Sequence, residues 1–175
     1  RRLGGDIVHA YKFSATPVEL ELNVVRHSDV PCLVATIETC VMEATVVAQC
    51  GDDACGAVVH HVFARVLNTQ RQYIRLRLPE GAEVWSAVVD GVPVRPGLED
   101  EHLMVPITRR KGSKTKAMPL ELIFVVKTPA LGVERPLELK LAEADVPMTH
   151  LFVEVFVPEH YKFKNWRGDL RRVEA

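Results

Sequence analysis

The chain has 175 residues, of which 47% are hydrophobic, and its 22 Lys and Arg side chains balance 23 Asp and Glu side chains. A chain of this length can bury about 70% of the surface that it exposes when unfolded, so we expect a sizeable core. The composition excludes a disordered chain, and the balanced charge gives no indication of a nucleic-acid partner.

The start of the chain and the length of its apolar runs bear on whether it is a fragment and whether it enters a membrane. The chain opens on Arg1 and RRLGG, without Met or a recognisable targeting segment, so we expect a fragment of a longer protein. The longest apolar runs, such as 122–126, are far shorter than the roughly 20 residues of a membrane-spanning helix. We therefore expect no membrane insertion by this segment.

Short runs of Val, Ile and Leu, bounded by Pro, Gly and Asp, predict a mostly β chain. The predicted strands are 6–13, 17–25, 32–49, 56–67, 72–78, 82–89, 92–95, 103–107, 119–127, 137–141 and 149–157. Local helix propensity is confined to LAEAD at 141–145, which Pro147 limits. We predict an all-β fold, an antiparallel β-sandwich that is Ig- or fibronectin-III-like in a broad sense, with about ten strands and little helix. It should occupy 1–163 as a single domain, and 164–175 should form a polar basic tail or linker.

The stretch CGDDACGAVVHH at 50–61 predicts a hairpin. If Cys50 and Cys55 flank a four-residue loop, His61 faces Ala44 on the apolar side and His60 faces the outer side. The imidazoles then point to opposite faces of the sheet. They also lie roughly 17–20 Å along the strand from the cysteines, at about 3.3 Å per residue.

This spacing argues against metal or redox chemistry at the two cysteines. Four zinc ligands must converge on one point, which the diverging histidines cannot do, and no Cys-x-x-Cys stands at a helix start. A disulfide between Cys50 and Cys55, and two free thiols, remain as alternatives. Cys32 and Cys40 stand among apolar residues, so we predict that both are buried.

The sequence VVDGVPV predicts a second hairpin, with a two-residue turn at Asp90-Gly91. Val89 should then face Val92. Counting back along the strand by twos points Trp85 into the core.

The run RRKGSKTK at 109–116 is the one strongly basic segment. We interpret it as a solvated loop between two strands or as an interaction loop for an anionic partner. Its basic residues are Arg109, Arg110, Lys111, Lys114 and Lys116. No aromatic side chain is interleaved to stack on bases, so nucleic acid is not expected.

The sequence carries none of the common catalytic motifs. Neither Gly-x-Ser-x-Gly nor His-Glu-x-x-His occurs, and Gly-rich phosphate loops are absent. The acidic pairs and triplets, Asp52 with Asp53 and 99–101, are typical of turns and lack the spacing of a calcium site. We assign no catalytic residue, no metal ligand and no cofactor, and expect no enzyme activity.

The segment RQYIRLRLPEGAEVWSAVVDGVPVRP at 71–96 resembles a β-sandwich module of large, uncharacterised multidomain proteins of bacterial envelopes and some protists. The pattern continues through LMVPI (103–107), PLELIFVV (119–126) and LFVEVFVPEHYKF (151–163). The resemblance implies a module of a larger, envelope-associated or extracytoplasmic protein, and it implies no catalytic residue.

Three functions follow as hypotheses. The leading one is a noncatalytic β-sandwich that serves as a structural or protein-interaction module, its partner being another protein or another domain of the parent chain. The alternative is a ligand-binding sandwich, for instance for carbohydrate, with Tyr161 and Trp166 as aromatic platforms. The third is an enzyme whose site is formed only by long-range contacts.

Overall fold

A computed structural model describes residues 34–49, 55–68, 70–107, 117–132 and 136–173. These residues form ten strands and no helix, which confirms the predicted all-β class. The strands are β1 (Ala35–Val47), β2 (Cys55–Asn68), β3 (Tyr73–Arg77), β4 (Ala82–Val89), β5 (Val92–Pro93), β6 (Gly97–Glu99), β7 (His102–Pro106), β8 (Ala117–Pro129), β9 (Glu143–Ala144) and β10 (Met148–Phe156).

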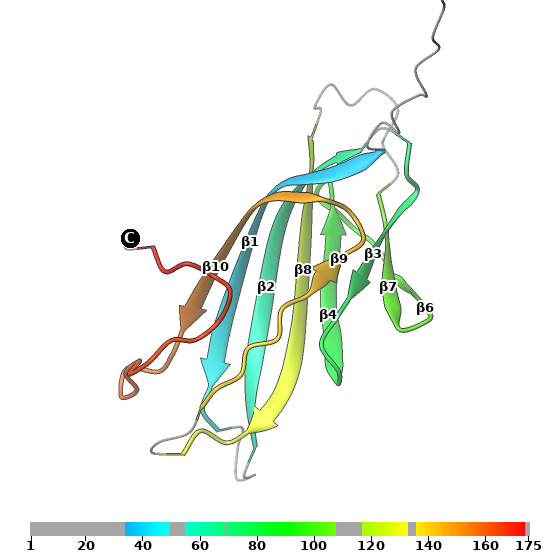
Figure 1. Ribbon diagram of the computed structural model, residues 1–175. Coiled ribbons are helices and arrows are strands. Elements are labelled where there is room, and N and C mark those ends of the chain that lie inside the picture. The colour runs from blue at the N-terminus through cyan, green and yellow to red at the C-terminus, as the bar shows by residue number, and fades with distance from the viewer. Residues whose placement is uncertain (1–33, 50–54, 69, 108–116, 133–135, 174–175) are drawn as a thin grey trace, which may run out of the picture. The chain divides into compact units, whose positions relative to one another are not determined.

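Six strands form the larger sheet, in the order β10-β1-β2-β8-β4-β5 (Figure 1). Neighbouring strands in this sheet are antiparallel, with one exception. The last strand, β10, runs parallel to β1, with Cys40 beside Leu151 and Ala44 beside Val155. The sequence predicted an antiparallel sandwich, and this one pair departs from it. The strands β1 and β10 are parallel because β10 reaches the sheet by a long crossover and not by a tight hairpin.

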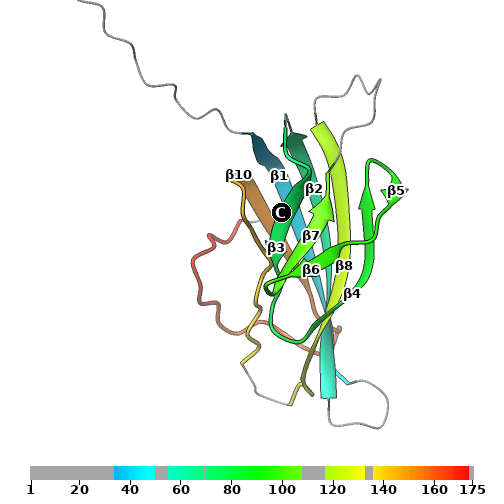
Figure 2. The ribbon, with the colours of Figure 1, turned by 90° about the vertical axis from the view of Figure 1, so that its right-hand side faces the viewer.

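The smaller sheet has the order β6-β7-β3-β9 and stands in front of the larger one in Figure 2. One core cluster joins the two sheets. Ile74 of β3 and Val105 of β7 pack with Leu122 and Phe124 of β8, and none of these four is more than 1% exposed. We call the face of the larger sheet that carries this core its inner face, and the opposite face its outer face.

The β1–β2 hairpin has a register that differs by one residue from the prediction. Ala44 pairs with His60, and Glu43 pairs with His61. His60 is therefore the inward histidine, 1% exposed, and His61 lies on the outer face. The prediction that the two imidazoles diverge is confirmed, but their assignment to faces was wrong, because a slip of one residue moves every side chain to the other face.

The β4–β5 hairpin has the predicted turn. Asp90 and Gly91 both have positive φ, 51° and 72°, and Val89 pairs with Val92. Trp85, however, is 62% exposed, so the prediction that it belongs to the core was wrong. The pairing with β8 is irregular between Val84 and Ser86, and this bulge reverses the alternation of faces beyond it.

Residues 136–147 cross the inner face in front of β2 and β8 (Figure 1). Leu137 and Leu139 pack down on Ala44, Val46 and Val58. The segment lies across the sheet and not beside a strand, so the strand predicted at 137–141 does not form. The weakly helical 141–145 instead contains β9, which pairs with β3.

The described strands all belong to the compact unit that begins at Leu33. The strands predicted at 6–13 and 17–25 lie outside the described residues, so the domain boundaries stay predictions. Among the described residues, no helix has the length and apolarity to span a bilayer.

Candidate functional site

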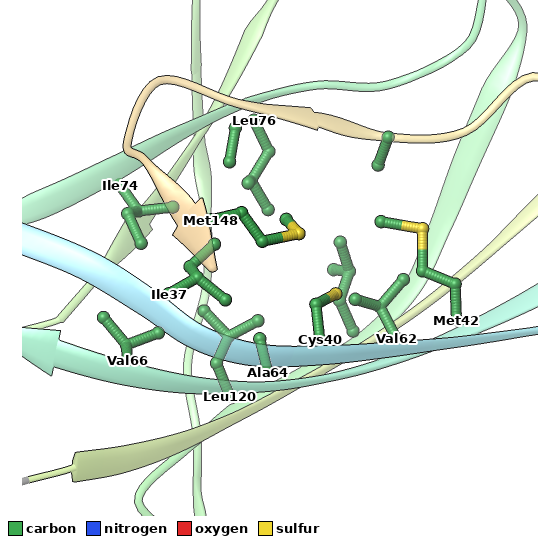
Figure 3. Close-up of a pocket in the computed structure, with 13 residues that line it drawn as sticks. Ile37, Cys40, Met42, Val62, Ala64, Val66, Ile74, Leu76, Leu120 and Met148 are labelled. Atoms are coloured by element: carbon green, nitrogen blue, oxygen red, sulfur yellow. The ribbon is translucent and has the colours of Figure 1, made fainter. Parts of the chain in front are cut away.

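The enclosed cavity between the two sheets offers no polar chemistry. Its volume is about 20 Å³, which is room for about one water molecule. Figure 3 shows the 13 lining side chains, whose only heteroatoms are the sulfurs of Cys40, Met42 and Met148. A ligand pocket is at least an order of magnitude larger, at roughly 300–1,000 Å³. This cavity is a packing gap of the core.

The thiol of Cys40, which lines this cavity, is unreactive because it is buried. Cys40 is 1% exposed, as predicted for a small buried hydrophobe. Burial raises the pKa of its thiol to about 11, because the thiolate would be poorly solvated there. At neutral pH the group is therefore a neutral thiol and a poor nucleophile.

An open groove lies on the inner face below the smaller sheet. Strands β2 and β8 contribute Val58, His60 and Val126 to it, and the remaining lining comes from the turn 79–81 and the segments 127–131 and 136–140. Its volume of about 370 Å³ lies within the range of small-molecule sites.

His60 is the buried titratable group of this groove, whose rim also carries Glu80, Lys127, Glu138 and Lys140. Its ring stacks on that of Phe124 with centroids 4.6 Å apart and the planes 9° from parallel. Its Nδ1 is buried and has no hydrogen-bond partner among the described residues. Burial lowers the pKa of His60 from its ordinary 6.5, so the ring is neutral at pH 7.

The outer face of the larger sheet is the second candidate. No described strand packs on it, and its side chains form a grid in which three neighbouring rows cross four strands. The grid consists of Val41, Glu43 and Thr45 of β1; Val59, His61 and Phe63 of β2; Glu121, Ile123 and Val125 of β8; and Phe152, Glu154 and Phe156 of β10. We call these twelve residues the outer grid.

Apolar side chains dominate the outer grid, and those on β10 are strongly exposed. Phe152 and Phe156 are 51% and 49% exposed. Toward the centre, the rings of His61 and Phe63 are in contact, with centroids 3.8 Å apart. His61 Nδ1 lies 3.8 Å from Glu43 Oε2, an ion pair when the imidazole is protonated. The grid thus combines an apolar surface with a carboxylate-rich middle row.

Several residues singled out in the sequence cannot be compared with the structure. The basic run with Arg109, Arg110, Lys111, Lys114 and Lys116 lies outside the described residues, as do Cys32, Asp52 and Asp53. Cys50 does too, so the Cys50–Cys55 bridge stays a prediction. Cys55 itself begins β2, where it is partly buried and pairs with Pro129 of β8.

The acidic triplet 99–101 has a structural role. Asp100 and Glu101 have positive φ, 46° and 64°, and form the tight turn between β6 and β7. Glu99 makes a long ion pair, 3.8 Å, with Arg75 of β3. Within the described ranges, no three His, Cys, Asp or Glu side chains are grouped so that they could hold a metal ion.

Neither Tyr161 nor Trp166, the aromatic platforms suggested by the sequence, lines the groove. Tyr161 is partly buried and donates a hydrogen bond from its hydroxyl to the carbonyl of Leu131, at 3.1 Å. Trp166 is 48% exposed, but neither it nor Trp85 lines the groove.

Sequence reasoning missed the outer grid, although one signal was present. The run PLELIFVV in β8 is apolar at successive positions, which is typical of strands covered on both faces. Leu122 and Phe124 point into the core, while Ile123 and Val125 lie on the outer face.

Comparisons with known proteins identify no family. No family model matches the chain, and no curated protein matches it. Among solved structures, the M1 zinc metallopeptidase from Deinococcus radiodurans is similar over 53% of this chain and 20% of its own, with 22% identity and a TM-score of 0.39. A mutant two-domain M1 zinc metallopeptidase bound to L-tryptophan is similar over 60% of this chain and 23% of its own, with 22% identity and a TM-score of 0.40. The chain therefore spans about a fifth of the length of these structures.

Proposed function

We propose that this protein is a noncatalytic β-sandwich that acts as a protein-interaction module through its outer grid. The observation that carries the proposal is an apolar sheet face that no described residue covers. Phe152 and Phe156 are about half exposed, and Val59, Phe63 and Ile123 continue the apolar surface toward the centre. Exposed apolar side chains gathered on one sheet face are typical of protein contact sites.

The strand sequences support a second layer on this face. A half-solvated antiparallel sheet alternates apolar and polar residues, whereas β8 carries apolar side chains on both faces. Covering Phe152, Phe156 and the partly buried Ile123 would remove apolar area from water at about 25 cal/mol per Å². The covering partner is another protein or another domain of the parent chain, in keeping with the resemblance to modules of large multidomain proteins.

Hydroxyl-radical footprinting tests whether this face is covered in the native setting. The protein isolated from its source, with its partners, is compared with the 175-residue chain alone. We expect Phe152 and Phe156 to be oxidised several-fold more slowly in the native assembly, because a partner shields them. Leu98, 78% exposed on β6 of the other sheet, is the matched control and should react equally in both. Equal oxidation of the two phenylalanines in both samples would overturn the proposal.

The groove at His60 favours a second candidate, a ligand-binding sandwich. Its lining within the described residues contains no Trp or Tyr to stack on a sugar, and it combines apolar side chains with Glu and Lys side chains. The groove therefore suits an amphipathic ligand better than a sugar that needs an aromatic platform. A fragment screen followed by amide NMR shifts tests this candidate. Hits should move the amides of Val58 and His60, and shifts confined to other surfaces would contradict it.

A further inference from the structure

The middle row of the outer grid carries two adjacent carboxylates. Glu43 of β1 and Glu154 of β10 are direct neighbours in the parallel pair, on strands about 4.8 Å apart. Like charges at directly opposed positions destabilise a sheet. The repulsion between these two carboxylates lowers the stability of the isolated chain, and a cation placed between them would relieve it.

The chain supplies only part of that compensation. On the far side of Glu43, His61 offers an imidazole at 3.8 Å. Glu154 has neither a hydrogen bond nor an ion pair with any described residue. Glu121 adds a third carboxylate to the outer grid, and the grid contains no Lys or Arg. Apart from the His61 imidazole, the ionisable side chains of the outer grid are therefore all carboxylates.

Apolar side chains flank both carboxylates along their strands. Phe152 and Phe156 lie two positions before and after Glu154 on the same face of β10, and Val41 precedes Glu43 in the same way on β1. A partner that covers these apolar groups also removes water from the carboxylates. Burying an unpaired carboxylate is unfavourable, and for two adjacent carboxylates a cation on the partner compensates better than a neutral hydrogen-bond donor.

This charge pattern selects among partners. A second copy of the chain would bring the same three carboxylates to the interface, and like charges across an interface oppose association. An Arg side chain suits the site better than Lys, because its planar fork can donate to two carboxylates at strand spacing.

We infer that the outer grid docks a protein surface on which an Arg side chain stands between apolar side chains, with the guanidinium bridging Glu43 and Glu154. This inference rests on the proposed function and adds the chemistry of the partner. The apolar contacts supply the buried area, and the guanidinium decides which partner fits.

The test uses a pair of matched probes and the 175-residue chain. One probe is a cyclised β-hairpin peptide that presents Leu, Arg and Leu on one face, and the other carries citrulline, a neutral isostere of Arg. Binding is followed by amide NMR shifts of the chain. We expect the Arg hairpin to shift amides of β10, β1 and β2 and to bind about two- to five-fold more tightly than the citrulline hairpin, the scale of an exposed ion pair.

Matched variants locate the charge effect. Glu43→Gln combined with Glu154→Gln should weaken binding of the Arg hairpin by about two- to five-fold. Glu101→Gln combined with Glu143→Gln removes the same charge at the smaller sheet, outside the outer grid and the groove, and should leave binding of the Arg hairpin unchanged. NMR spectra of each variant verify the fold.

The outcomes separate this inference from the proposed function. Equal binding of the Arg and citrulline hairpins at the outer grid would overturn the inference, while shielding of Phe152 in the footprinting experiment would still support the proposed function. Binding of the Arg hairpin elsewhere, or no binding, would also overturn the inference. Equal oxidation of Phe152 and Phe156 in the native assembly and in the chain alone would instead overturn the proposed function.

Discussion

Burial decides the chemistry of two titratable residues on the inner face. Cys40 and His60 both point into the core from strands that also carry polar residues, and both are 1% exposed. Desolvation disfavours the charged form of each group, so the pKa of the thiol rises and the pKa of the imidazole falls. Both groups are therefore neutral parts of the packing at pH 7.

Thiol labelling checks this at Cys40. With the chain reduced and held at pH 8, Cys40 should resist a maleimide reagent in the folded state, because its pKa of about 11 leaves little thiolate and its sulfur is buried. In urea it should react rapidly. Cys55, partly buried at the start of β2, is the internal comparison. Mass spectrometry of the two peptides measures the rates, and equally fast labelling of native Cys40 would contradict the prediction.

At the scale of strands, two local irregularities decide which face a side chain occupies. The register of the β1–β2 hairpin puts His60 inward, and the bulge in β4 turns Trp85 outward. Alternation predicts that neighbouring residues diverge, and it did so correctly for His60 and His61. It cannot predict the absolute face, because one extra residue in a loop or bulge inverts every assignment beyond it.

Substitutions in β4 and β8 test the bulge. Trp85→Ser should change the free energy of unfolding by no more than about 0.5 kcal/mol, as for an exposed position. Leu122→Ala is the contrasting core change and should cost about 2–5 kcal/mol, because Leu122 is 1% exposed. Urea denaturation measures both. A loss of 2 kcal/mol or more for Trp85→Ser would return this side chain to the core.

At the scale of the whole molecule, long-range pairing builds the sandwich. The chain leaves β8, crosses the inner face, pairs β9 with β3, and returns to lay β10 parallel to β1. This path covers the inner face, where His60 lies, and leaves the outer grid without a described neighbour. Because the assembled sandwich buries His60, protonation of this imidazole is coupled to unfolding of the whole fold.

The pH dependence of unfolding tests this coupling. The folded pKa of His60 lies below its ordinary 6.5, so the unfolded chain takes up a proton that the folded chain does not. The free energy of unfolding should thus fall as the pH drops below about 6.5 toward the folded pKa. In His60→Leu this part of the slope should disappear, whereas His150→Leu, which removes an exposed imidazole from β10, is the control. Parallel slopes for His60→Leu and the parent chain would contradict the prediction.

The sequence by itself determined the fold class and most strand positions. Period-two patterns and turn residues are local signals, and 82–89 and Asp90-Gly91 form as these signals predict. It also indicated, in PLELIFVV, that β8 is apolar on both faces.

Only the tertiary structure decided the rest. The parallel placement of β10, the strand at β9 where local propensity favours helix, and the meeting of Glu43 with Glu154 all depend on contacts between residues far apart in the chain. Local pattern contains no information on such pairings, because each is selected by how the complete set of strands buries the common core. The outer grid is the clearest case, since its four strands come from three distant parts of the sequence and form one surface only after the sheet has assembled.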